Sequence, residues 1–252
     1  MDGAVKDRGQ SSMLVLALDS STRTGSIALA RDGVLVDVCE GDAGRRHAER
    51  LPGDLVTLLA AHGCDLRDVT LLAVTAGPGG FTGLRVGLAT IQGLALALDR
   101  RVFVASTLDL LARAGAESAA DAHWVGAWMQ GMRGEVFTEL HERLSDGRMR
   151  RALDAAVGTP DSAATAWADV AADGTLAVIG DGWPTHGDAL RARFGERLHV
   201  CETPRLAGVL ALEASRRAGE AVTPAAVRPA YVRRPDCVVT REQAGLPVAG
   251  DR

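Results

Sequence analysis

Lysine is almost absent from this sequence of 252 residues: Lys6 is the only one, and every other Lys or Arg position is an arginine. A P-loop nucleotide site needs a lysine on the phosphates, and a pyridoxal enzyme needs one for its Schiff base. Because Lys6 lies in a polar segment at the start of the chain, both classes of protein are excluded.

Paired cysteines and long apolar runs are also missing. The four cysteines lie far apart and form no Cys-x-x-Cys pair, which argues against a thiolate metal site and indicates a reducing cytosol. No stretch approaches the roughly 18–20 uninterrupted apolar residues of a membrane span, and the N-terminus lacks the apolar core of a signal peptide. We therefore expect a cytoplasmic protein without a membrane contact.

Charge and catalytic motifs exclude further classes. The net charge of −4 makes nucleic-acid binding by charge alone unfavourable. His47 is followed four residues later by Leu51, and His141-Glu142 leads to Ser145, so no zincin-type histidine pair exists. Neither a Gly-x-Ser-x-Gly elbow nor a dinucleotide-binding glycine motif is present. The chain therefore shows no evident catalytic equipment.

The order three strands, helix, strand, helix occurs twice along the chain. Such alternation predicts an α/β architecture in which helices cover mixed sheets, and a doubled βββαβα order is the arrangement of the actin-like (ASKHA, ribonuclease H-like) superfamily, with two lobes. In the first half we expect strands at 14–18, 25–30, 34–38, 71–75 and 102–105 and helices at 48–61, 82–98 and 108–114. In the second half we expect strands at 123–129, 135–140, 149–153 and 176–179 and helices at 160–170 and 206–218.

These segments define the expected domains. Residues 1–12 are predicted to be a disordered extension, 13–115 a first ASKHA-like domain, 116–240 a second one, and 241–252 a flexible tail. The connection around 138–159 is polar and long, which makes it the least regular part of the predicted second domain.

The segment from Gly77 to Gly87 lies between a predicted strand and a predicted helix. Its backbone amides are able to cradle an anion at the start of the helix. Alternatively, the glycines make a tight bend, Thr82 caps the helix, and another element packs close to the glycines. Within the helix, one stripe is apolar (Leu84, Leu88, Ile91, Ala95, Leu98) and an adjacent face is smooth (Gly83, Gly87, Thr90, Ala97). We expect the smooth face to accept a helix of a partner, with packing inside the chain as the alternative.

The polar turn Asp19-Ser20-Ser21-Thr22 follows the first predicted strand. Short hydroxyls and turn amides are able to hold a phosphate, while Asp19 holds a metal-bound water. The alternative is a turn whose polar groups satisfy one another.

Three blocks of residues resemble the TsaB (YeaZ) family, within the Gcp/glycoprotease M22-like group of the actin-like superfamily. The first runs from Leu16 to Thr22 with Ser26-Ile27-Ala28, and the second is His47-Ala48-Glu49-Arg50-Leu51-Pro52. The third, from Gly77 to Gly87, is similar to the family's Gly-Pro-Gly-Ser-Phe-Thr-Gly-Leu-Arg-Ile-Gly signature almost position for position. The second half matches faintly, and it reads Gln130-Gly131-Met132 where the family usually has Asp-Ala-Arg.

The resemblance implies a scaffold subunit rather than a catalyst. Members pair with the catalytic paralogue TsaD through two helices of the N-terminal domain, and the ATPase TsaE joins them. TsaD transfers threonylcarbamoyl to adenosine 37 of tRNAs that read codons beginning with A. ATP and metal are expected on the partner subunits, tRNA is expected only through the complex, and the chain alone is expected to form a homodimer. TsaD holds metal with a His-x-x-x-His pair, of which this chain keeps only His47.

Two functional hypotheses follow. In the first, a partner-binding surface is built from nine residues: His47, Leu51, Leu55, Gly83, Leu84, Arg85, Gly87, Leu88 and Ile91. In the second, the chain is a small-molecule kinase or ATPase that uses Asp19 and Ser21 at the phosphate-binding turn. Near the C-terminus, Arg228, Arg233 and Arg234 are able to touch tRNA phosphates within an assembly, or they form a solvated face.

Overall fold

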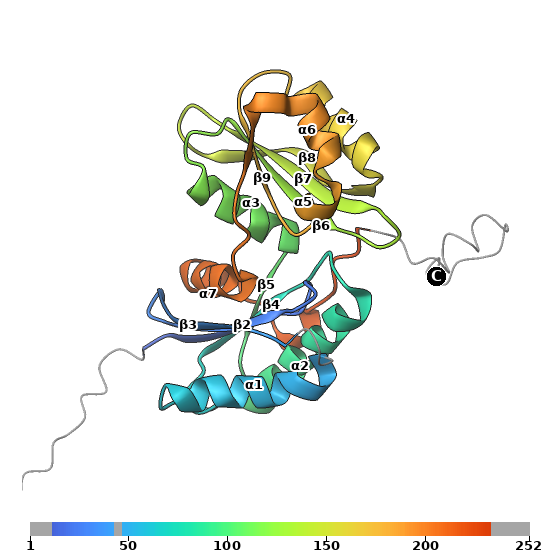
Figure 1. Cartoon of the computed structure of the whole chain (residues 1–252). Helices are drawn as coiled ribbons and strands as arrows, with labels where there is room; N and C mark the ends of the chain where they lie inside the picture. The colour runs from blue at the N-terminus through green and yellow to red at the C-terminus, as the bar shows by residue number, and fades with distance from the viewer. Residues whose placement is uncertain (1–11, 43–46, 233–252) are drawn as a thin grey trace, which may run out of the picture. The chain divides into compact units, whose positions relative to one another are not determined.

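The computed structural model describes residues 12–42 and 47–232 and divides the chain into two compact units (Figure 1). The first unit contains the described residues up to Leu110 together with Pro204–Arg228, and the second contains Leu111–Thr203. The predicted extension at 1–12, apart from Ser12, and the predicted tail at 241–252 lie outside the described residues.

The first unit is built on a five-stranded sheet in the order β3-β2-β1-β4-β5. Strands β1, β4 and β5 pair in parallel. Strand β2 runs antiparallel to both of its neighbours, β1 and β3, so β3 has the same direction as β1. The strands are β1 (Leu14–Asp19), β2 (Ser26–Arg31), β3 (Val34–Glu40), β4 (Leu71–Thr75) and β5 (Val102–Ala105). Asp32 and Gly33 both have positive φ and form the tight turn between β2 and β3.

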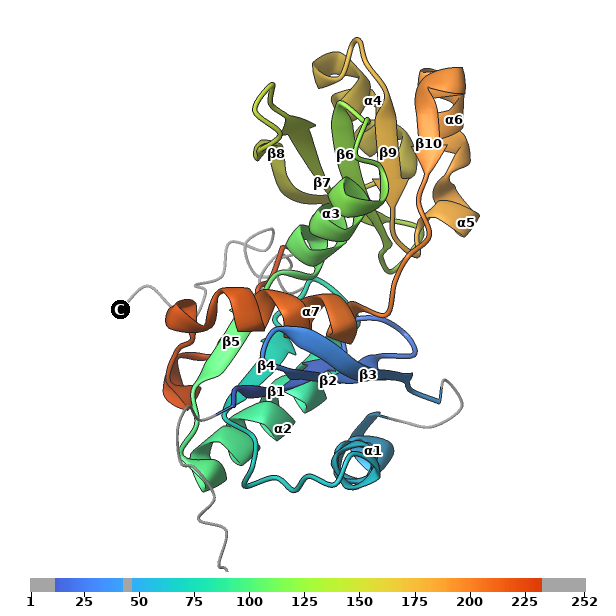
Figure 2. The same cartoon turned by 90° about the vertical axis from the view of Figure 1, so that its left-hand side faces the viewer.

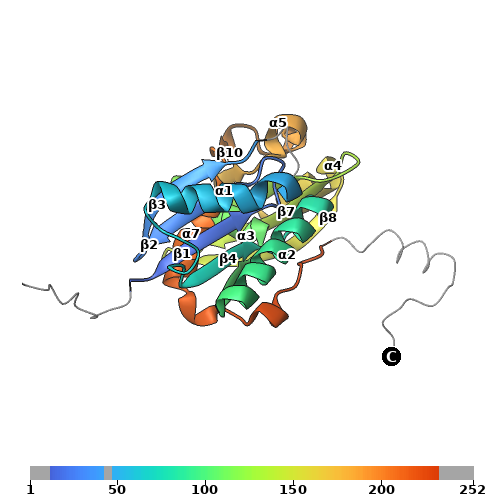
Figure 3. The ribbon, with the colours of Figure 1, turned by 90° about the horizontal axis from the view of Figure 1, so that it is seen from below.

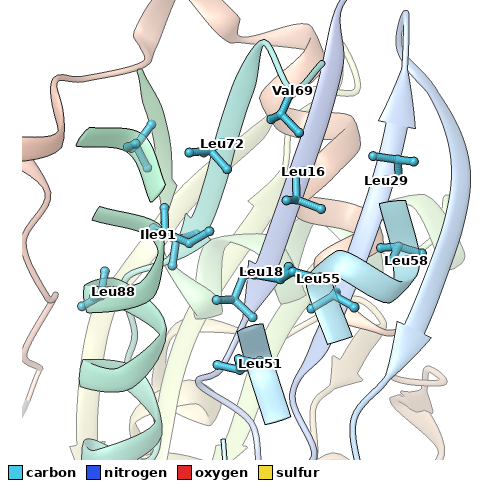
Figure 4. Packing of buried hydrophobic residues seen from close by; sticks show 14 of the residues in the cluster. Leu16, Leu18, Leu29, Leu51, Leu55, Leu58, Val69, Leu72, Leu88 and Ile91 are labelled. Carbon is cyan, nitrogen blue, oxygen red and sulfur yellow. The ribbon is translucent and has the colours of Figure 1, made fainter. Parts of the chain in front are cut away.

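Helices cover both faces of this sheet. Helices α1 (His47–Ala61) and α2 (Phe81–Leu98) lie on one face, and α7 (Leu206–Arg216) lies on the other (Figure 2). Leu51, Leu55 and Leu58 recur at helical spacing and are buried against leucines of the strands (Figure 4). Burial of these side chains in one cluster is the main force that holds α1 on the sheet.

The position of α7 differs from the expected domain division. The expected second domain, 116–240, includes this helix, whereas its residues pack on β1, β2 and β3 of the first unit. The backbone N–H of Ala207 donates to Ser26 Oγ at 3.0 Å. The apolar face of α7 specifies that the helix covers a sheet, but it does not specify which one.

The second unit repeats the sheet order of the first as β8-β7-β6-β9-β10, and the boundary between the units falls within α3 (Thr107–Ser118). Its strands are β6 (Trp124–Gln130), β7 (Val136–Arg143), β8 (Met149–Gly158), β9 (Leu176–Ile179) and β10 (Leu198–Val200). Its other helices are α4 (Pro160–Val170), α5 (Trp183–His186) and α6 (Asp188–Phe194). The doubled order predicted from the sequence is therefore confirmed at the level of strand pairing.

Three elements of the second unit and the length of β8 were not predicted. Strand β8 was expected to end at 153, but its pairing with β7 continues to Gly158. Strand β10 has only three residues, and α5 and α6 are short. Segments of this length contain too few residues to show a reliable period.

Arg143 provides the last turn of α3 with hydrogen-bond donors. Its Nη2 donates to the carbonyls of Ala116 (2.8 Å) and Ala119 (3.1 Å), and its Nε donates to that of Ala122 (2.9 Å). Ala116 lies in the last turn of α3, where carbonyls lack the usual partner within the helix, and Ala119 and Ala122 lie just beyond the helix. The guanidinium also offsets the negative end of the helix dipole.

Replacing Arg143 by alanine is expected to lower the free energy of unfolding of the second unit by about 2 kcal/mol. Chemical denaturation followed by circular dichroism measures this change. Arg150→Ala is the matched control, because Arg150 is exposed and its salt-bridge partner is Glu142. This control is expected to lower the free energy of unfolding by less than about 1 kcal/mol. Equal effects of the two substitutions would contradict the assignment.

Candidate docking face

The carboxylate of Asp19, in the polar turn after β1, accepts hydrogen bonds from neighbouring hydroxyl and N–H groups. Asp19 is fully buried and accepts hydrogen bonds from Ser21 N (3.0 Å), Ser21 Oγ (2.5 Å), Thr22 Oγ1 (2.7 Å) and Thr75 Oγ1 (2.8 Å). A carboxylate offers about four acceptor positions. The interactions of Asp19 therefore match the reading in which the polar groups of the turn satisfy one another.

The glycine segment packs directly on this turn. The N–H of Gly80 donates to the carbonyl of Ser21 at 3.0 Å. A Cβ on Gly79 would overlap the same carbonyl oxygen, and one on Gly87 would overlap Ser20 Oγ. The glycines are thus required by close contacts inside the chain.

The first turn of α2 differs from the sequence prediction. Gly80, not Thr82, occupies the N-cap position, and within the described part of the chain no side chain caps the helix. Thr82 is exposed. The helix therefore begins one residue earlier than expected, at Phe81.

Most of the nine residues predicted to bind a partner lie in the core. Six of them are buried on the sides of α1 and α2 that face the sheet, and we correct their assignment: Leu51, Leu55, Leu84, Gly87, Leu88 and Ile91. Of the others, Gly83 is half-buried and Arg85 is exposed. His47 is the first residue of α1, and its side chain lies outside the described part of the structure. The helical spacing of these apolar residues is as predicted, but their side chains pack against the sheet of the same chain and not against a partner.

The residues of α1 and α2 that point away from the sheet form a different surface, which we name the docking face. The two helices lie side by side on the sheet (Figure 3). The docking face consists of Pro52, Gly53, Val56, Thr57 and Ala60 of α1 and Phe81, Arg85, Ala89, Gly93 and Leu96 of α2, all exposed.

The docking face is apolar and nearly uncharged. Val56 is 53% exposed, Phe81 47% and Leu96 69%. Arg85 is the one charged residue among the ten, and its guanidinium carbon lies 3.9 Å from the centre of the Phe81 ring, a cation–π contact. Exposed apolar surface that spans two helices is typical of a site that another protein covers.

Small residues shape this surface. A Cβ at Gly53 or Gly93 would meet no atom within 4 Å, so neither glycine is required by packing inside the chain. Together with Ala60 and Ala89, these positions leave the outer sides of the helices low, which allows the backbone of another helix to approach closely.

Polar contacts hold α1 at both of its ends. Near the N-terminus, the buried Arg50 pairs with Asp54 at 2.7 Å and donates to the carbonyl of Thr24. Beyond the C-terminus, His62 Nε2 lies 2.8 Å from Asp37 Oδ2 on β3, and this hydrogen bond lowers the pKa of the Asp37 carboxyl. The docking face is therefore built on a helix anchored to the sheet edge.

Helix α2 has an unusual composition for a surface helix. Among the described helices it alone has the length and hydropathy of a membrane-crossing segment, a test that core helices of globular proteins also pass, and 28% of its residues are buried. Its inner side packs on β4 and β1.

Of the three C-terminal arginines predicted to touch tRNA, the structure describes only Arg228. Arg228 donates to the carbonyls of Ala225 (2.6 Å) and Val227 (2.8 Å). Arg233 and Arg234 lie outside the described residues. Their proposed contact with tRNA phosphates stays a prediction.

Comparisons with known proteins identify the family. A family model described as TsaD, tRNA N6-adenosine threonylcarbamoyltransferase, matches residues 38–167, just over half of the chain. The tRNA threonylcarbamoyladenosine biosynthesis protein TsaB of Escherichia coli K12 is 31% identical over 179 residues, which are 70% of this chain and 74% of that protein. The chain belongs to the TsaB (YeaZ) family.

Two other similar proteins align with more of the chain. An uncharacterized protein of Mycobacterium tuberculosis H37Rv is 32% identical over 225 residues, 88% of this chain and 92% of that protein. The solved structure of YeaZ from Pseudomonas aeruginosa has a TM-score of 0.66 at 32% identity and covers 87% of this chain and 99% of that one. The likeness to YeaZ confirms the predicted fold, two α/β units of the actin-like ASKHA type.

Proposed function

We propose that this chain is a non-catalytic subunit in the synthesis of threonylcarbamoyladenosine at position 37 of tRNA, and that it binds and activates a TsaD-type transferase through the docking face. Curated TsaB relatives are named for tRNA threonylcarbamoyladenosine biosynthesis. In this proposal TsaE and the tRNA join only through the complex, and the partner subunits hold ATP and metal.

The docking face is the observation that carries the proposal. The ten residues of this face expose valine, phenylalanine and leucine next to small residues, and Arg85 is the one charged residue among the ten; the exposed Glu49 of α1 lies outside the face as defined. A surface of this composition gains free energy when a partner removes it from water. Leu51, which stands where a second histidine would complete a metal-binding pair, is buried in the core, and this agrees with a subunit that leaves the chemistry to its partner.

The test is to mix this chain with the TsaD-type paralogue of the same genome and to measure the molar mass by light scattering after size-exclusion chromatography. We expect a complex of one copy of each chain. Alone, the chain is expected to elute as a dimer, because the same apolar face is able to meet its copy across a two-fold axis. Separate elution of the two proteins at micromolar concentration would contradict the proposed function, and a one-chain mass for the protein alone would contradict the homodimer.

A further inference from the structure

The contact between Ser20 and Gly87 links the turn after β1 to the docking helix α2. Gly87 lies in the second turn of α2 on the side that faces the sheet, and it is buried. A Cβ built on Gly87 would lie 2.8 Å from the Cβ of Ser20 and closer still to its Oγ. The hydroxyl of Ser20 thus occupies the space that a side chain at position 87 would need.

Hydrogen bonding does not account for the orientation of the Ser20 side chain. Ser20 is 1% exposed, and its Oγ has no hydrogen-bond partner among the described residues. A buried hydroxyl without a partner costs free energy. The side chain therefore fills a hollow in α2 without gaining a polar contact, so its contribution there is steric.

The turn that carries Ser20 is rigid. Asp19 binds Ser21, Thr22 and the β4 residue Thr75 through its carboxylate. Ser21 in turn accepts a hydrogen bond from Gly80, the residue that caps α2. The turn consequently touches α2 at two places about two helical turns apart, at its N-cap and at Gly87.

We propose that Ser20 and Gly87 form a positioning contact that sets the depth of α2 on its sheet and so the height of Phe81, Ala89 and Leu96 on the docking face. This inference rests on the proposed function. Interfaces between proteins are packed as densely as protein interiors. A shift of α2 by about 1 Å, the size of the overlap that a new Cβ has to relieve, is therefore enough to spoil the fit to a partner.

The test measures the dissociation constant of the TsaD-type partner by calorimetry for four variants at a temperature where each is folded. Gly87→Ala is expected to weaken binding at least 10-fold. The double variant Ser20→Gly, Gly87→Ala makes room for the new methyl group and is expected to return to within about threefold of the original affinity. Ser20→Gly alone leaves a hollow instead of an overlap, and it is expected to weaken binding less than Gly87→Ala does.

Gly126→Ala is the control for destabilisation without a change in α2. A Cβ at Gly126 would overlap the ring of Trp167 in the second unit, so this variant is expected to lower the melting temperature and to keep its affinity. If Gly87→Ala binds like the original chain, or if the double variant stays as weak as Gly87→Ala, the positioning contact is refuted.

Two further measurements separate the possible failures. Leu96→Arg changes the docking face itself; if it leaves the affinity unchanged, the proposed function of this face fails, whatever the result for Gly87→Ala. If Gly87→Ala does not yield folded protein, Ser20→Cys places a larger atom against Gly87 and is expected to weaken binding in the same direction. An unchanged affinity of Ser20→Cys would then overturn the inference.

Discussion

Replacing Leu96 by arginine is expected to weaken binding of the TsaD-type partner about 100-fold, which corresponds to about 2.7 kcal/mol. Leu96 is the most exposed large apolar residue of the docking face, at 69%. In a complex its side chain would be removed from water, and an arginine at that position would bring an unpaired charge into an apolar interface. Calorimetric titration of the partner into each variant measures the change.

The control for this variant is Val34→Arg. Val34 is 67% exposed, close to the value for Leu96, but it lies on the edge strand β3 and not on α1 or α2. The control therefore adds the same charge at an equally exposed apolar position away from the docking face. Equal losses of affinity in the two variants would place the interface elsewhere.

Replacing Asp19 by alanine is expected to lower the free energy of unfolding of the first unit by about 4 kcal/mol. The substitution leaves four donors without their acceptor, three hydroxyl groups and one backbone N–H, of which only the Thr22 hydroxyl is partly rather than fully buried. Each unsatisfied buried group costs about 1–3 kcal/mol, reduced where the turn relaxes. Urea denaturation followed by circular dichroism measures the loss.

Asp65→Ala serves as the control, because the Asp65 carboxylate also binds a backbone N–H in a turn, that of Arg67 at 2.6 Å, but is exposed. Its effect is expected to be below about 1 kcal/mol. A phosphate-binding role for the turn makes the opposite prediction: Asp19→Ala would abolish binding of ATP and magnesium in a calorimeter with little change in stability.

The composition and periodicity of the chain were sufficient to predict its fold class. Alternating strands and amphipathic helices define two repeats, and each repeat folds into a sheet of the same strand order. These signals are local, because a period of two or of about 3.6 residues is set by backbone geometry. The segment from Gly77 to Gly87 carries the family's signature, and two of its glycines, Gly79 and Gly87, have contacts too close for a side chain.

The sequence alone was less informative about α2. This helix is apolar around most of its circumference, so its pattern does not distinguish the side that meets the sheet from the side that meets solvent. The glycine at position 87 looked like part of a smooth outer face, but it is an inner residue pressed against Ser20. The outer side instead consists of Phe81, Arg85, Ala89, Gly93 and Leu96.

Contacts between distant residues decided the remaining questions. For the turn at Asp19, the sequence leaves a phosphate site and a turn whose polar groups satisfy one another as alternatives. The hydroxyl of Thr75, on the neighbouring strand β4, donates to the same carboxylate, and only the tertiary structure reveals this contact. Helix α7 belongs to the first unit because its apolar face packs on β1, β2 and β3 and the N–H of Ala207 donates to Ser26 of β2. Residue types and their spacing determined which elements form and which family they belong to. Only the tertiary structure decided which faces are buried and which acceptors are already occupied, because those properties depend on neighbours far away in the chain.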